Sequence, residues 1–122
     1  MTKNIDKNVV CLMPWIHMHT WPNGNTFPCC MSSTDHVFGN VHKESVNKLI
    51  NNDNFKTIRK QMLNGEKPEA CKRCYELETS ADSWTLRKNS LESFKNHLDL
   101  FEKTNEDGSI DDFKMYYMDI RF

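Results

Sequence analysis

Residues 11–30 read CLMPWIHMHTWPNGNTFPCC, and this stretch combines three of the five cysteines with a clear turn signal. Aromatic and histidine side chains alternate with Ile, Met and Thr over residues 15–21, a period of two that predicts a strand. The Pro-Asn-Gly sequence at 22–24 predicts a turn, because Asn and Gly tolerate a positive φ. Residues 26–29 are expected to return as the second strand. The stretch therefore predicts a β-hairpin that brings the cysteines at its two ends towards each other.

Helical periodicity replaces the period of two after a turn at Gly39-Asn40. Apolar side chains recur at spacings of three and four over residues 44–64, which predicts two short consecutive helices. Ser45 and Asp53 are the expected N-caps, and Gly65 in the following turn is the expected stop.

A third helix is expected to open near Cys71. Its predicted apolar face consists of Leu77, Ala81 and Trp84. Residues 91–101 continue at helical spacing as a core-facing stripe, with a predicted break at Asn89-Ser90. Asp107-Gly108 predicts a turn, and residues 113–122 are rich in aromatic and β-branched types, which predicts a strand.

Together these patterns predict an α+β fold, with a small N-terminal β-hairpin, following helices, cysteines placed between hairpin and helix, and a C-terminal strand. The chain stops at Phe122 inside the strand pattern. Two interpretations follow: a terminal strand that pairs with the hairpin, or a chain cut short just before a second domain.

Composition excludes several classes of protein. The chain has 122 residues, 38% hydrophobic and 11% aromatic, so it is long enough for one domain and too aromatic for full disorder. A net charge of −1 argues against a nucleic-acid partner. The longest apolar run, Val9 to Ile16, is far shorter than the roughly 20 residues of a membrane span. The N-terminus has no apolar signal core, so a cytoplasmic protein with reduced thiols is expected.

Cys71-Lys72-Arg73-Cys74 is a CxxC pair. Positions three apart share one face of a helix, so both sulfurs can reach the same metal centre. The positive end of the helix dipole and the charges of Lys72 and Arg73 are expected to lower the thiol pKa and favour the ligating thiolate.

The upstream cysteines extend this pair to a set of four. The turn brings Cys29 towards Cys11, and adjacent Cys29 and Cys30 on an extended chain point to opposite faces. The predicted set is therefore Cys11, one of Cys29 or Cys30, Cys71 and Cys74. Four thiolates suit tetrahedral zinc or a cubane iron–sulfur cluster.

Four sequence segments carry a resemblance to a known family. They are CLMPWIH at 11–17, NGNTFPCC at 23–30, GNV at 39–41 and CKRCYE at 71–76. Over about residues 9–90 the chain resembles the SPASM/twitch domains of radical SAM enzymes, and the absence of cysteines after Cys74 is similar to the shortened twitch form. The resemblance implies one auxiliary [4Fe-4S] cluster, held by Cys11, Cys29, Cys71 and Cys74, that serves electron transfer and substrate positioning.

One departure from that family concerns catalysis. The CxxxCxxC motif that binds the S-adenosyl-L-methionine-cleaving cluster is absent, so the chain is expected to be inactive alone. The ending at 115–122 is similar to the first strand of a radical SAM barrel. The implied organisation is a flexible arm at 1–8, the cluster-binding domain at 9–90, a linking helix and turn at 91–110, and the first strand of a truncated barrel at 111–122. The implied partners are that barrel in cis and a peptide or protein substrate, with S-adenosyl-L-methionine bound only by the full-length parent.

Other interpretations remain open. A structural zinc domain that binds a partner fits the same four cysteines. A thiol oxidoreductase built on the CxxC pair lacks the βαβ context of such enzymes. His17 and His19 are better explained by packing or by support of the ligands than by metal ligation. Cys30 is expected to be a buried thiol or a neighbour of the cluster, with ligation in place of Cys29 as the alternative.

Overall fold

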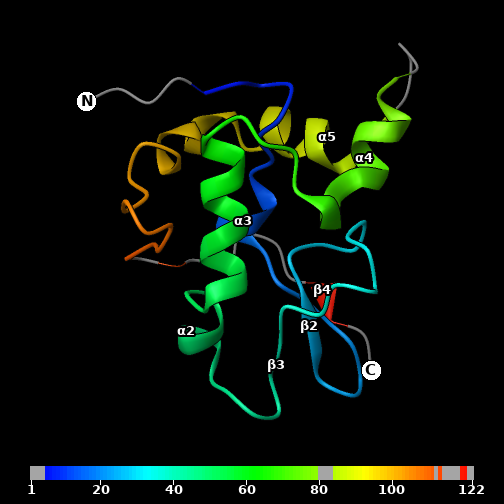
Figure 1. The fold of residues 1–122 in the computed structure, drawn as a ribbon, viewed down its shortest axis with the longest axis vertical. Helices are drawn as coiled ribbons and strands as arrows, with labels where there is room; N and C mark the ends of the chain where they lie inside the picture. The colour runs from blue at the N-terminus through cyan, green and yellow to red at the C-terminus, as the bar shows by residue number, and fades with distance from the viewer. Residues whose placement is uncertain (1–4, 80–83, 112, 114–118, 121–122) are drawn as a thin grey trace.

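The structure is a computed structural model that describes residues 5–79, 84–111, 113 and 119–120 (Figure 1). The elements in chain order are α1 (Met13–Ile16), β1 (His19–Thr20), β2 (Asn25–Phe27), β3 (Gly39–Asn40), α2 (Val46–Leu49), α3 (Asp53–Leu63), the 3-10 helix η1 (Glu69–Cys71), α4 (Lys72–Leu77), α5 (Leu86–Ser93), the 3-10 helix η2 (Lys95–Leu100) and β4 (Asp119–Ile120). This arrangement confirms the predicted α+β class. No helix in the described part of the chain is both long and apolar enough to cross a membrane.

A small sheet with the strand order β3-β2-β1-β4 lies at one end of the molecule. β1 and β2 form the predicted antiparallel hairpin, in which His19 lies opposite Phe27. Gly24 in the connecting turn has a φ of +91°, a conformation that favours glycine. β4 pairs with β1 in parallel, so the described part of the C-terminal segment contacts the hairpin. The rest of the predicted C-terminal strand, apart from Phe113, lies outside the described residues.

The beginning of the hairpin differs from the prediction, because residues 13–16 form the helix α1 and not a strand. Every residue from 9 to 20 is buried, so the alternation of side-chain types along this stretch does not reflect one exposed and one buried face. Pro14 stands in the first turn of α1, where its missing N–H is tolerated. The strand therefore begins only at His19.

The predicted helices α2 and α3 are confirmed, with one shift at a cap. The Ser45 side chain accepts a hydrogen bond from the backbone N–H of Lys48, as expected of an N-cap. The N-cap of α3 is Asn52 and not Asp53, because the Asn52 side chain accepts from the N–H of Phe55. Gly65 follows α3 with a φ of +79° and ends it as predicted.

The third predicted helix is divided. α4 ends at Leu77, and both Leu77 and Trp84 are exposed, at 41% and 64%, so they do not form an apolar face. Ala81 lies outside the described residues. α5 passes through Asn89-Ser90 without the predicted break, and the helical path is interrupted at Phe94.

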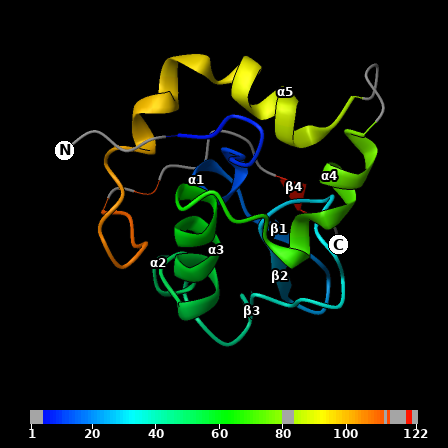
Figure 2. The same ribbon diagram turned by 45° about the horizontal axis from the view of Figure 1, so that its top comes forward.

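The core lies between α1, α3 and the segments that cross them. Trp15 packs edge-on against Phe101 with ring centroids 4.8 Å apart. The fully buried guanidinium of Arg59 on α3 donates to the carbonyls of Pro14, Ile50 and Gly108, and so joins three separate segments. Figure 2 shows α5 running along the N-terminal segment, on the opposite side of α1 from the sheet.

Candidate functional site

The cysteines lie at the junctions between elements. Cys11 precedes α1, Cys29 follows β2, Cys71 ends η1, and Cys74 lies in α4. These four side chains are buried, with exposed fractions of 5–8%. Cys30 is exposed, and the expectation that it is buried is wrong, because residues 29–32 form a turn that directs the two adjacent side chains into different environments. Of these two adjacent cysteines, Cys29 is therefore buried like the other three, whereas Cys30 is exposed to solvent.

Electrostatic coupling shows that the four buried cysteines share one neighbourhood. Burial raises the pKa of Cys29 well above its usual range, and the charges of Cys11, Cys71 and Cys74 raise it further. Burial likewise raises the pKa of Cys71, again with contributions from Cys11 and Cys74. Ionisation of Cys11, Cys71 or Cys74 therefore makes ionisation of Cys29 less favourable.

Specific hydrogen bonds hold the segments that carry these cysteines together. The N–H of Ser33, in the loop after Cys29, donates to the carbonyl of Ala70 at 2.8 Å, next to Cys71. The Tyr75 hydroxyl, next to Cys74, donates to the carbonyl of Val9 at 2.5 Å, in the segment that leads into Cys11. The four cysteines thus come from chain segments fixed to one another.

The expected lowering of the thiol pKa in the CxxC pair is not found. Burial raises the pKa of Cys71 and Cys74, and it outweighs the favourable interactions at both sites. Lys72 and Arg73, which were expected to supply positive charge, are exposed on α4. The cation that lowers the pKa of these thiols is Arg87.

Sequence reasoning missed Arg87, which is 3% exposed and lies on α5. Its guanidinium forms an ion pair with Glu78, including a hydrogen bond from Nε to Oε2 of 2.9 Å. Its Nη1 donates to the carbonyls of Lys7 and Val10, each at 2.8 Å. The guanidinium also lies 5.5 Å from the centre of the Tyr75 ring. Arg87 therefore joins α4, α5 and the segment before Cys11 around the thiols.

Ser90, one turn further along α5, was expected only as a helix break. Its Oγ lies 3.6 Å from the Cys11 Sγ, within hydrogen-bonding distance for sulfur. Burial raises the pKa of Cys11 to about 11, while hydrogen bonds from the Met13 backbone and with Ser90 act in the opposite direction. No sequence signal marks Ser90, because it is separated from Cys11 by most of the chain.

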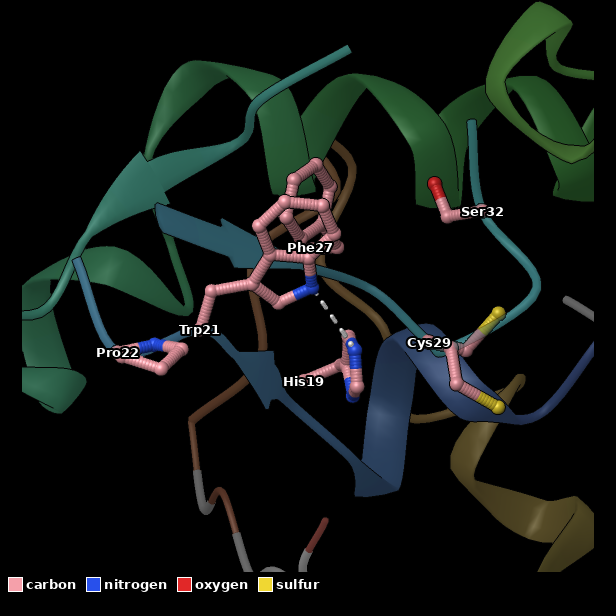
Figure 3. A pocket seen from close by; sticks show the side chains of 7 residues that line it. His19, Trp21, Pro22, Phe27, Cys29 and Ser32 are labelled. Carbon is pink, nitrogen blue, oxygen red and sulfur yellow. Dashed lines mark hydrogen bonds between the residues drawn. The ribbon is translucent and has the colours of Figure 1, made fainter. Parts of the chain in front are cut away.

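An open cavity of about 190 Å³ adjoins Cys29 (Figure 3). Its wall includes Trp21 and Phe27, whose ring centroids are 5.4 Å apart. The Trp21 indole N–H donates to Nε2 of His19 at 3.2 Å. The cavity therefore combines aromatic surface, a histidine and the thiol of Cys29, with Pro22, Cys30 and Ser32 completing its lining.

The donor chemistry of the site fits an iron–sulfur cluster. Cysteine thiolate is the usual ligand of such clusters, and the four buried cysteines match the number of thiolates that a cubane uses. Within residues 5–79, 84–111, 113 and 119–120, no three His, Cys, Asp or Glu side chains are arranged to hold one metal ion. His17 and His19 are both buried, and His19 also lines the cavity beside Cys29.

Comparison with known proteins agrees with this chemistry. The family model described as SPASM, an iron–sulfur cluster-binding domain, matches residues 11–75, which is just over half of the chain and includes all five cysteines. Searches for similar curated proteins and for similar solved structures found no match. The match begins at Cys11 and ends one residue after Cys74, and on that basis the chain belongs to the SPASM family of iron–sulfur cluster-binding domains.

Proposed function

We propose that Cys11, Cys29, Cys71 and Cys74 hold a single [4Fe-4S] cluster, as in the shortened twitch form of the family. The observation that carries the proposal is the division among the five cysteines: four are buried and electrostatically coupled, and Cys30 is exposed. A cubane with four thiolate ligands uses this number of sulfurs. The buried setting also supports the proposal, because an apolar shell limits access of water to a cluster.

The proposed role is that of an auxiliary cluster in a radical SAM enzyme. A bound cluster of this kind supplies one-electron transfer, while the protein positions it and sets its potential. The chain would act together with a radical SAM barrel in cis, because its own sequence lacks the CxxxCxxC motif. The chain alone should therefore form no 5′-deoxyadenosine from S-adenosyl-L-methionine under reducing conditions.

The cavity beside Cys29 supports the second part of the role, substrate positioning. It opens to solvent next to a proposed cluster ligand and offers aromatic rings and the His19 imidazole as contact groups. Its volume of about 190 Å³ suits a single side chain better than a whole small-molecule ligand, for which pockets are about 300–1,000 Å³. This size favours a peptide or protein substrate that inserts one residue.

Anaerobic reconstitution with iron and sulfide tests the cluster. About four irons and four sulfides per chain, with a broad visible absorption band, are expected of one cubane. Zinc bound at one equivalent without sulfide, both in the protein as purified and after reconstitution, would instead support a structural zinc domain and refute the proposal.

A further inference from the structure

α5 lies outside the segment that matches the family, yet it contacts Cys11, one of the four proposed ligands. Ser90 Oγ is 3.6 Å from the Cys11 sulfur. The Arg87 guanidinium, one turn earlier on α5, donates from Nη1 to the carbonyl of Val10 at 2.8 Å, directly before Cys11 in the chain. One helix thus places a hydroxyl and a cation beside the segment that carries Cys11.

The hydrogen bonds of Ser90 show what ligation of iron would change. Its hydroxyl donates to the carbonyl of Arg87 at 2.7 Å, and its Oγ accepts from the N–H of Leu12 at 3.1 Å. While Cys11 carries its proton, the S–H can donate to the same Oγ. A thiolate bound to iron has no proton, so the contact persists as a hydrogen bond only if the Ser90 hydroxyl turns to the sulfur. Ser90 is 1% exposed, which excludes water as a ready substitute donor.

We propose that α5 sets the reduction potential of the cluster, with Ser90 as a positioning residue whose hydroxyl donates to the Cys11 sulfur. This inference rests on the proposed function. Reduction adds one negative charge to the cluster and its ligands. A hydrogen bond to a ligand sulfur, like a nearby cation, stabilises the more negative state and raises the potential. Arg87 and Ser90 are three residues apart, so they act from the same face of the helix.

The experiment compares S90A, S90T and S93A in the reconstituted 122-residue chain. Ser93 is an exposed serine in the same helix and provides the matched control. Iron and sulfide are counted first, and the potential is then measured by redox titration with the EPR signal of the reduced cluster. At a fixed ambient potential, S90A should lower the ratio of reduced to oxidised cluster by up to roughly tenfold, which corresponds to about 59 mV for one electron. S93A should leave the ratio unchanged, and S90T, which keeps the hydroxyl, should stay close to the unmodified chain.

The possible outcomes distinguish failure of the proposed cluster from failure of the proposed role of Ser90. If the unmodified chain binds no cluster, the proposed function itself fails. If S90A is loaded and has the potential of S93A, the role of Ser90 is refuted while the cluster stands. If S90A loses the cluster, the S90T variant decides between two explanations. A cluster retained by S90T at the original potential supports the hydroxyl contact. Loss of the cluster from S90T as well assigns Ser90 to packing and overturns the inference.

Discussion

Replacing Arg87 with Met should destabilise the whole domain. Methionine keeps much of the apolar length of the side chain but removes the charge. The change leaves Glu78 without its ion-pair partner and the carbonyls of Lys7 and Val10 without their donor. Removal of one member of a buried pair costs about 3–5 kcal/mol. The total stability of a small domain is about 5–15 kcal/mol, so the expected loss is a large fraction of it.

Urea denaturation of the anaerobically purified chain, followed by tryptophan fluorescence, measures this loss. Trp15 is 1% exposed and hydrogen-bonded to Thr104, so its environment reports on the folded core. With a urea m-value of about 1–3 kcal/mol/M, a loss of 3 kcal/mol lowers the midpoint by at least about 1 M. Lys88→Met at the exposed neighbouring position is the control and should change the midpoint little. A loss below about 1 kcal/mol for Arg87→Met would refute the argument.

A double-mutant cycle separates the ion pair from the carbonyl contacts. Glu78→Gln alone leaves the Arg87 charge only partly compensated, and the double variant removes both partners. The double variant should therefore lose less free energy of unfolding than the sum of the two single variants. Simple additivity would mean that the pair contributes no coupling and that the carbonyl contacts carry the effect.

Three further predictions concern other sites. Cys29→Ser should abolish or destabilise the cluster, because serine is a poor replacement for a soft thiolate. Cys30→Ser should keep the iron and the visible spectrum. The reverse result would make Cys30 the ligand in place of Cys29. Arg59→Met should cost about 3 kcal/mol or more by thermal or urea unfolding, because three carbonyls lose a buried cationic donor, and a near-neutral result would contradict that account. Burial alone would raise the pKa of Glu78, but hydrogen bonds from Arg87 and Thr85 bring it below the ordinary 4.5. The carboxylate therefore contributes to folding stability above about pH 4.5, and this contribution is lost as the pH falls through the lowered pKa. Glu78→Gln should accordingly flatten the acid side of a plot of urea midpoint against pH.

The hairpin and the caps were predictable because their signals are local. Gly24 and Gly65 form their turns through their own positive φ, and Ser45 caps its helix by accepting from the N–H of Lys48, three residues later. The prediction of a strand at 13–16 was wrong. A period of two indicates a strand only where one face is buried and the other exposed, and here every side chain is buried. The third helix was predicted too long because apolar side chains at helical spacing, such as Leu77 and Trp84, can also lie exposed.

The site was predictable only in part, for a related reason. Cysteine is rare enough that its spacing carries information, and the four positions expected to ligate are the four that the fold buries together. Arginine and serine are common on surfaces, so nothing in the sequence distinguishes Arg87 from Arg73 or Ser90 from Ser93. Only the tertiary structure shows that Arg87 and Ser90 are buried and that they contact the segment of Cys11.

The burial of the four thiols has a consequence for maturation of the protein. Their pKa values are raised, so at neutral pH they are protonated in the folded chain without iron. Although a cavity opens to solvent beside Cys29, iron and sulfide delivered to the site would have to displace these protons from side chains that are at most 8% exposed. Loading would therefore be easier before the segments around Cys11 and Cys74 have packed together. Cluster delivery and the last step of folding would then be a single event, and a chain that closes early would be a stable but empty by-product.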